Sequence, residues 1–402
     1  MSAWLHIIGV TEQGVDALPP AQRALLDSAE TVLGPKRLLP ESGGTQNVMA
    51  WKIPLSAMIE QVLAARGSQT IVLATGDPNW FGIGVTLGRH LDADEFTLHP
   101  AASAFQLAAA KMHWPLQNVT TLSLHGRKPA HLQPHILPGN RILALTSDAG
   151  TLGAVRDMLN ARCYGQSRLS VLENLGADAE KRTDFAANEP LPEICEFYTL
   201  AIECVADHAA PFLPMLPGLP DESFVSDGQL TKRDVRATTL AKLGPYPGAL
   251  LWDVGAGCGS VGIEWMRAAR NAKAICFERD PARFEMIDTN RMALGVPDLE
   301  IRAGEALAGM IDQPVPDAIF IGGDVANQAL FAACWQALRL GGRLVANAVT
   351  IEGERALFDR QAQHGGELTR IEIAVLDNVG QYRAFKPRMA VTQWLVTKGE
   401  TA

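Results

Sequence analysis

Short apolar runs alternate with segments of helical spacing along most of the chain. In the second half, five such runs are predicted to be strands because they are brief and bounded by turn residues. They are residues 250–254, 274–278, 299–302, 317–321 and 343–349. Strands that alternate with helices in this way build a doubly wound α/β sheet. Residues 371–376 and 390–397 are expected to close that sheet as an antiparallel pair.

The first half shows the same alternation. Strands are predicted at residues 4–10, 70–75, 119–125, 141–147 and 169–175, and residues 195–205 alternate like a half-exposed strand. Helices are predicted at residues 20–32, 55–65 and 104–113, where Gly34, Gly67 and an N-cap at Ser103 mark boundaries. The fold class is therefore α/β throughout.

A proline-rich stretch separates the halves. Residues 207–222 contain four prolines and little periodicity, so we expect a linker there, with an ordered surface loop as the alternative. The predicted domains are residues 1–206 and 223–402, a division that suits a chain of 402 residues. In the second domain, Thr231 and Asp234 have the spacing of an N-cap and its third helical residue, and Gly244 marks the end of that helix.

Charge and cysteine usage narrow the class of protein. The net charge of −9 argues against a broad nucleic-acid surface, although a small anionic substrate in a local basic pocket is compatible with it. The six cysteines show no C-x-x-C spacing, which indicates buried thiols in a reducing, cytoplasmic setting. The sequence predicts no signal peptide and no membrane span. His125, His131 and His135 lack a cysteine partner nearby, and we expect no metal site.

The most informative motif is a strand that runs into alternate glycines. Asp253 ends the strand, and Gly255, Gly257 and Gly259 follow at alternate positions before a helical pattern. Glycines allow a tight turn and close approach of a ligand, and a helix N-terminus favours a negative ligand group. The arrangement predicts a nucleotide cradle.

Two nucleotide cofactors compete for this cradle. Gly257, Gly259 and Gly262 also fit the dinucleotide pattern G-x-G-x-x-G, and Glu278 ends the next strand where a ribose hydroxyl is held. Asp253 decides between them, because it is placed to take a ligand ammonium group, directly or through water, and a dinucleotide needs no anion there. The loop is similar to the S-adenosylmethionine (SAM) loop of Rossmann-like methyltransferases.

The resemblance extends over the second half. The blocks at residues 226–237, 252–264, 277–280, 303–306, 316–324 and 340–352 resemble class I SAM-dependent methyltransferases, and in this order they resemble those that methylate and decarboxylate precorrin-6B at carbon 15. In the first half, residues 6–10, 72–84, 98–115 and 145–151 resemble the carbon-5 branch of the tetrapyrrole (corrin/porphyrin) methylases. The first loop departs from that family, whose loop is rich in glycine and proline, because here it reads Val10, Thr11, Glu12, Gln13 and Gly14.

Together the halves resemble a family of fused precorrin-6B C5,15-methyltransferases (decarboxylating). The resemblance implies a tetrapyrrole-methylase-like domain followed by a Rossmann-like class I domain, with two SAM sites. It implies methylation at C5 and C15 with loss of the ring-C acetate carboxyl group, which gives precorrin-8 in cobalamin biosynthesis. The implied partner is a polycarboxylate tetrapyrrole, with no nucleic acid and no membrane, and we expect a homo-oligomer.

Site residues follow from this resemblance. The expected SAM contacts in the second domain are Thr231, Asp253, Gly255, Ala256, Gly257, Cys258, Gly259, Glu278, Glu305 and Ala306. Those in the first domain are Gly76, Asp77, Pro78 and Ser103. Lys232, Arg233 and Arg236 are candidates for holding substrate carboxylates, because cations pair with them, and Asp324 is a candidate for proton transfer.

Each assignment has a plainer alternative. Thr231 is also an ordinary helix N-cap, and the cations at 232–236 are also solvated helix charges. For the whole chain, the alternatives are another SAM-dependent methyltransferase acting on RNA or a small molecule, a dinucleotide-dependent oxidoreductase, or a non-catalytic binding module in one half. The acidic balance counts against RNA, and the methylase-like first half counts against the oxidoreductase.

Overall fold

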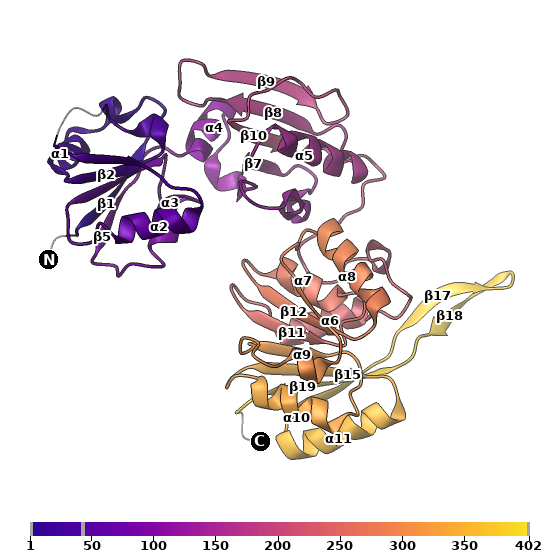
Figure 1. Cartoon of the computed structure of the whole chain (residues 1–402). Helices are drawn as coiled ribbons and strands as arrows, with labels where there is room; N and C mark the ends of the chain where they lie inside the picture. Colours follow the sequence, from indigo (N-terminus) through magenta and orange to yellow (C-terminus); the bar gives the residue numbers. More distant parts are fainter. Residues whose placement is uncertain (1–2, 42–44, 400–402) are drawn as a thin grey trace. The chain divides into compact units, whose positions relative to one another are not determined.

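The computed structural model describes residues 3–41 and 45–399. The chain divides into two compact units (Figure 1). One contains the described residues up to Pro129 together with His135–Pro211, and the other contains Ala130–Pro134 and the described residues from Phe212 onward. The change of unit at Pro211 falls inside the proline-rich stretch 207–222.

The first unit begins with a parallel five-stranded sheet of order β3-β2-β4-β1-β5. Its strands are β1 (Leu5–Val10), β2 (Thr31–Gly34), β3 (Asn47–Ala50), β4 (Thr70–Thr75) and β5 (Phe96–His99). Its helices are α1 (Pro20–Ser28), α2 (Leu55–Leu63) and α3 (Ile83–Leu87), with 3₁₀ turns η1 (Val15–Ala17) and η2 (Lys36–Leu38). The helix expected over 20–32 is too long, because residues 31–34 are fully buried and pair with β4 instead.

A second, mixed sheet completes this unit, with strand order β6-β7-β10-β8-β9. Its strands are β6 (Thr120–Ser123), β7 (Arg141–Leu145), β8 (Arg168–Glu173), β9 (Lys181–Ala186) and β10 (Tyr198–Glu203). The helices that follow β5 and β7 are α4 (Ala104–Met112) and α5 (Ala149–Ala161), and a 3₁₀ turn, η3 (Leu116–Asn118), follows α4. Most of the next 3₁₀ turn, η4 (Pro129–His135), belongs to the second unit. The expectation of a half-exposed strand at 195–205 is wrong, because β10 lies between β7 and β8 and is buried over Tyr198–Ile202.

The second unit is built on a seven-stranded sheet of order β13-β12-β11-β14-β15-β19-β16. Its strands are β11 (Leu250–Val254), β12 (Lys273–Glu278), β13 (Glu300–Ala303), β14 (Ala318–Ile321), β15 (Arg343–Ala348), β16 (Glu367–Ile371) and β19 (Val391–Thr397). Its helices are α6 (Arg233–Leu243), α7 (Ser260–Ala268), α8 (Pro281–Ala293), α9 (Ala306–Gly309), α10 (Gln328–Ala337) and α11 (Ile351–His364), with 3₁₀ turn η5 (Asp221–Ser223). The five predicted strands of this half are all present.

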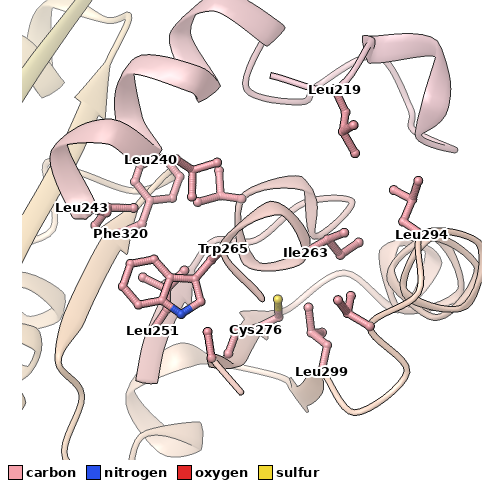
Figure 2. Packing of buried hydrophobic residues seen from close by; sticks show 14 of the residues in the cluster. Leu219, Leu240, Leu243, Leu251, Ile263, Trp265, Cys276, Leu294, Leu299 and Phe320 are labelled. Carbon is pink, nitrogen blue, oxygen red and sulfur yellow. The ribbon is translucent and has the colours of Figure 1, made fainter. Parts of the chain in front are cut away.

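Side chains of β11 alternate between the two faces of the sheet and contribute to the hydrophobic core on each side. Leu251 packs into a cluster with Ile263 and Trp265 of α7, and Figure 2 shows this core. Trp252 belongs to the opposite cluster, which includes Phe331 of α10. Successive strand residues point to opposite faces, so helices cover the sheet on both sides and β11 is buried on both faces.

The closing pair of the sheet differs from the expectation in one strand. β19 pairs antiparallel with β15 and with β16, as an antiparallel closing pair requires. However, the partner strand is Glu367–Ile371, not 371–376. The chain leaves the sheet after Ile371 and forms a separate two-stranded hairpin, β17 (Ala374–Val379) and β18 (Tyr382–Pro387), whose residues are all exposed.

Across the described ranges, no helix combines the length and the apolar character that crossing a membrane requires.

Candidate functional site

The carboxyl ends of the central strands of the second unit gather the motif residues. β11 runs parallel to both β12 and β14, with Val254 aligned to Phe277 on one side and to Ile321 on the other. The loops that follow Val254, Glu278 and Ile321 therefore start at the same edge of the sheet. The chain leaves β11 toward β12 and later returns through β14, and ligands bind at such a switch point in open α/β sheets.

The glycine loop requires glycine at each of its alternate positions. Gly255, Gly257 and Gly259 all have left-handed backbone angles, with φ of 71°, 60° and 78°. A Cβ on Gly255 would lie 3.0 Å from the backbone nitrogen of Gly323, and one on Gly259 would lie 3.1 Å from Ile287. Because side chains disfavour this conformation, the loop can be this tight only with glycine.

Glu278 fastens the glycine loop to the neighbouring strand. Its carboxylate accepts hydrogen bonds from the backbone nitrogens of Gly257 (2.8 Å), Arg279 (2.9 Å) and Asp280 (3.0 Å). The side chain is almost entirely buried. A carboxylate has about four acceptor positions, so these three bonds leave capacity for one more donor. Its expected contact with a ribose hydroxyl remains a prediction.

Asp253 lies beneath the loop, in the interior of the second unit. Its side chain has no exposed surface, and one oxygen, Oδ2, accepts a hydrogen bond from the Gly262 nitrogen at 2.9 Å. The other oxygen has no hydrogen-bond partner among the described residues. Burial raises the pKa of Asp253 to about 7. Strand β11 carries this side chain into the interior toward α7, which argues against the expected direct contact with a ligand ammonium group, and the expected contact through water remains a prediction.

Arg236 is also buried, which overturns its expected role. Its guanidinium bonds to the carboxylates of Glu264 (2.7 Å) and Asp221 (3.0 Å) and to the carbonyl oxygens of Thr231 and Leu219. Its side chain has no exposed surface. These contacts engage the guanidinium on all sides, so Arg236 does not hold a substrate carboxylate. It instead joins α6 to α7 and to the segment before α6.

The predicted residues at the start of α6 are more accessible than Arg236. Lys232 is half-buried and donates from Nζ to the Gly228 carbonyl at 3.0 Å, while Arg233 is exposed. Lys232 is also the N-cap position of α6, without a side-chain cap, so the expected cap at Thr231 is wrong. Thr231 is half-buried and contributes its carbonyl to Arg236. Gly244 ends the helix in the left-handed conformation, as predicted.

Asp324 lies in the loop after β14, on the ligand edge of the sheet. Its backbone is left-handed, with φ of 53°, and its side chain is exposed apart from one bond, in which Oδ2 accepts from Asn327 Nδ2 at 2.8 Å. Non-glycine residues in this conformation carry strain, which is concentrated at functional sites. The structure thus brings Asp324 close in the fold to Gly255, because Gly323 packs against the glycine loop.

The remaining predicted contacts of this unit lie around the same edge. Gly304 donates its N–H to the Glu278 carbonyl at 2.9 Å, and exposed Glu305 is the N-cap of α9, which begins at Ala306. Ala256 is half-buried, whereas Cys258 is buried below the loop. Cys258 can therefore meet a ligand only through its backbone.

In the first unit, three loops converge at the carboxyl ends of β1, β4 and β5. Gly76 is left-handed, with φ of 65°, and a Cβ there would lie 3.2 Å from Ser103 Cα. Asp77 accepts from the Asn79 nitrogen at 2.8 Å, and Pro78 is buried. Ser103 forms a capping box with Gln106 at the start of α4, so its hydroxyl and its N–H are both engaged. Its cap is confirmed, and its role in cofactor binding remains a prediction.

Sequence reasoning missed Gly9 at this edge. A Cβ on Gly9 would lie 2.0 Å from the Gly76 carbonyl oxygen and 2.7 Å from the Ala101 nitrogen. Only glycine lets these three backbones meet. The signal was present, because a glycine interrupts an otherwise apolar strand run, which marks close approach of another backbone.

The atypical first loop borders a pocket of about 210 Å³, whose lining residues are Gly9, Thr11, Gly14, Ala17, Leu18, Pro19, Gln22, His99, Pro100 and Ala101. Glu12 in this loop is held by Arg37, whose Nη1 lies 2.5 and 2.6 Å from the two carboxylate oxygens. Arg37 also donates to Thr75 Oγ1 at 2.8 Å, just before Gly76. An ion pair therefore holds this loop, which lacks the glycine and proline that are typical of the tetrapyrrole methylases. The predicted turn at Gly76, Asp77 and Pro78 does not line this pocket.

Comparison with known proteins accounts for both units. Residues 222–398 match the family described as "Precorrin methyltransferase domain", and residues 5–189 match "Tetrapyrrole (Corrin/Porphyrin) Methylases". A precorrin-6Y C(5,15)-methyltransferase [decarboxylating] of Sinorhizobium sp is 44% identical over 99% of this chain and 97% of its own length. One from Mycobacterium tuberculosis (strain CDC 1551 / Oshkosh) is 36% identical over 98% of this chain and 99% of its own.

A solved structure is similar to part of the chain. The C-terminal domain of precorrin-6Y C5,15-methyltransferase from Rhodobacter capsulatus is 42% identical, covers 46% of this chain and 100% of its own, and has a TM-score of 0.44.

Proposed function

The chain belongs to the family of precorrin-6Y C(5,15)-methyltransferases (decarboxylating), and we propose that it divides the family's reactions between its two units. The family uses SAM and acts in cobalamin biosynthesis. In this proposal the first unit methylates carbon 5, and the second methylates carbon 15 and removes the acetate carboxyl group. The observation that carries the proposal is that each unit has its own set of adjacent parallel strands with a left-handed glycine turn at their carboxyl edge. The full-length similarity leaves the oxidoreductase and RNA-methylating alternatives without support.

The second unit has residues that fit SAM. The left-handed turn from Gly255 to Gly259 keeps side chains away from the backbone at the N-terminus of α7. The nearest atom to a Cβ on Gly257 would be the Gln229 carbonyl oxygen at 3.4 Å, so this face of the loop is free of side chains from the loop itself. Glu278 would hold the ribose with its remaining acceptor position, and Glu305 and Ala306 would border the adenine.

The first unit would hold a second SAM molecule. Gly9, Gly76 and Ala101 bring three backbones together at one edge, where no side chain intervenes. Such an edge suits a flat, partly polar ligand bound through backbone groups. Gly76, Asp77, Pro78 and Ser103 remain the proposed contacts. A count of two cofactor sites is part of the proposal.

For methyl transfer, the chain's residues need to position the substrate carbon beside the methyl group of SAM and to exclude water from the site. SAM supplies an electrophilic methyl group on a sulfonium. The nucleophilic ring carbon must be held at roughly 3–3.5 Å from that methyl in line with the breaking bond. Fixed backbone dipoles of the glycine loop then replace water around the reacting groups. No protein nucleophile is required.

For decarboxylation, the chain must hold the substrate carboxylates and must hold or move one proton. The bond between the acetate methylene and its carboxyl carbon breaks, carbon dioxide leaves, and the electron pair passes into the protonated ring. Lys232 has two N–H donors left after its bond to Gly228 and would hold a substrate carboxylate. Asp324 Oδ1 makes no hydrogen bond within the described residues and would hold or move the proton at the edge of the site, while Oδ2 stays bonded to Asn327.

The test is product analysis with full-length variants. Wild type incubated with precorrin-6Y and SAM should give a product with two added methyl groups and one carbon dioxide lost, by mass spectrometry. Gly257→Arg should abolish carbon dioxide release and one methylation, because the new side chain occupies the face of the loop assigned to SAM. Gly76→Arg should abolish only the other methylation. Loss of carbon dioxide release in the Gly76 variant, with retention in the Gly257 variant, would reverse the assignment.

A further inference from the structure

Phe81 holds a strained backbone conformation in the loop that begins at Gly76. Its φ is 57°, in the left-handed region, although its side chain is bulky and aromatic. Bulky residues are outliers in this region, and such strain persists only where the surrounding structure enforces it. Burial in a core does not account for the strain, because the side chain is 41% exposed. Strain of this kind is concentrated at functional sites, so the exposed ring is a candidate for ligand contact.

The chain folds back on itself around Phe81 and fixes its position. The Gly84 nitrogen donates to the Pro78 carbonyl oxygen at 2.9 Å. A Cβ on Gly82 would lie 2.5 Å from the same oxygen, so only glycine allows this close approach. Phe81 is therefore held next to the turn that the proposed function assigns to SAM.

Two neighbours hold the ring of Phe81. The ring centroids of Phe81 and Phe105 are 5.9 Å apart, and Phe105 is buried in the first turn of α4. The guanidinium of Arg127 lies over the Phe81 ring, 5.6 Å from its centroid, which is within the distance of a cation–π contact. Arg127 belongs to the loop after β6, so this contact joins a loop of the first sheet to a loop of the second sheet.

Arg127 carries a charge that no acidic side chain neutralises. It is exposed, and within residues 3–41 and 45–399 its guanidinium has no hydrogen-bond acceptor and no ion-pair partner. Lys128, the next residue, is also exposed and has no ion-pair partner in those ranges. The loop itself is anchored, because the Gly126 nitrogen donates to Ser147 Oγ at 2.9 Å. In a chain with a net charge of −9, two such adjacent cations form a local site for an anion.

We propose that Phe81 and Arg127 bind the tetrapyrrole substrate of the first unit, an assignment that rests on the proposed function of this unit as the carbon-5 methylase. A polycarboxylate tetrapyrrole is an apolar ring system with carboxylates at its rim. The exposed part of Phe81 offers an apolar contact to the ring system, and the guanidinium beside it can take a rim carboxylate through two parallel N–H bonds. Because Phe81 is fixed next to the Gly76 turn, the two contacts together would hold the reacting carbon beside the methyl group of SAM.

The combination of ring and charge favours this ligand over a simple anion. Inorganic phosphate would use the cations of Arg127 and Lys128 and would have no use for an exposed aromatic ring. The strained placement of Phe81 directly under the guanidinium is explained by a ligand that needs both an apolar contact and a cation at its rim.

The experiment measures methylation of precorrin-6Y by the full chain, by mass spectrometry, for the methyl group that Gly76→Arg fails to add. Arg127→Gln should raise the KM of this reaction about 10- to 150-fold, because a charge-assisted hydrogen bond to the substrate is lost. Phe81→Gly relieves the strained backbone but removes the ring, so it should raise this KM roughly 2- to 12-fold. Phe81→Tyr keeps the ring and should restore most of the affinity. The kcat should change less than the KM, since neither side chain reacts.

Two controls separate substrate binding from folding. Arg168→Gln removes another cation of this unit, whose side chain is 79% exposed and pairs with Glu203. Through Glu203, Arg168 is aligned with the start of β7, at the other end of this sheet from the Arg127 loop, so this variant should keep the wild-type KM. Calorimetry should show unchanged SAM affinity in the variants at Phe81 and Arg127, because both leave the glycine turns intact.

Unchanged KM values in Arg127→Gln and Phe81→Gly, with one methylation still lost in Gly76→Arg, would overturn the substrate contact and leave the proposed function standing. A raised KM in the Arg127 variant alone would contradict the proposal, because Phe81 would then have no part in binding. A SAM affinity that falls in parallel with the rise in KM would show that the pair only shapes the loop. If Gly76→Arg loses neither methylation, the proposed function itself is wrong, and the substrate contact is rejected with it.

Discussion

Arg236 and Glu264 form an ion pair that is completely enclosed by the second unit. Nε of Arg236 lies 2.7 Å from Oε1 of Glu264, and neither side chain is more than 1% exposed. Glu264 also accepts from the backbone nitrogens of Gly218 (2.6 Å) and Leu219 (3.0 Å). The pair therefore anchors the proline-rich segment before α6 onto α6 and α7. What looked like a substrate-binding cation is a structural one.

The first prediction concerns this pair. Glu264→Gln leaves a buried guanidinium with a weaker partner, so the second unit should lose on the order of 3 kcal/mol of stability. Hydrogen exchange of peptides from α6 and α7 in increasing urea measures this. The control is Arg370→Gln, which removes the exposed pair with Glu354 and should cost at most about 1 kcal/mol. Equal effects of the two substitutions would contradict the anchoring role.

The second prediction concerns pH. Burial raises the pKa of Asp253 to about 7 from its ordinary value of 3.8. Between these values the folded state keeps a proton that the unfolded state has released, so the contribution of Asp253 to stability is full below about pH 4 and declines as the pH rises toward 7. Asp253→Asn removes this dependence. The free energy of unfolding of the variant, relative to wild type, should increase between these two pH values, by up to about 1.4 kcal/mol per pH unit. Parallel stability curves for the two proteins would refute a raised pKa.

The third prediction concerns Glu278. Glu278→Ala leaves the Gly257 nitrogen and the ribose hydroxyls without their acceptor, at a cost of about 1–3 kcal/mol, which corresponds to roughly 5- to 150-fold weaker SAM binding. Calorimetry on the full chain should show two sites in wild type and one unchanged site in the variant. Glu278→Gln keeps an acceptor for Gly257 and should weaken binding less. Unchanged affinity at both sites in the alanine variant would show that Glu278 only shapes the loop.

The fourth prediction separates chemistry from backbone strain at Asp324. Asp324→Asn tolerates the left-handed backbone and keeps an oxygen for Asn327, but its amide cannot transfer the proton at neutral pH. Carbon dioxide release should fall at least about tenfold, in the lower range for a lost acid or base, while SAM binding by calorimetry stays unchanged. Asp324→Gly relieves the strain and should show the same loss of activity. If the glycine variant retains activity, Asp324 has no part in proton transfer.

Local sequence patterns determined most of the secondary structure and the glycine turns. Strand β11, its run into Gly255, and the cap of α4 at Ser103 depend on residues close together in the chain, since apolar periodicity, left-handed glycine and capping are local effects. The expected α/β class with two methylase-like halves is confirmed by the fold and the relatives.

Tertiary structure decided where individual side chains point and which strands are central. Lys232 and Arg236 lie one turn apart on one segment, yet Arg236 alone meets Glu264, 28 residues away, and is buried. β10 is buried because β7 and β8, both distant in sequence, flank it. Residues 374–379 have the apolar content of a sheet strand, but strand β16 of the seven-stranded sheet ends at Ile371, so these residues lie outside that sheet. Periodicity reports that a residue has an apolar or polar neighbourhood on its own element, whereas burial depends on partners that only the folded chain brings together.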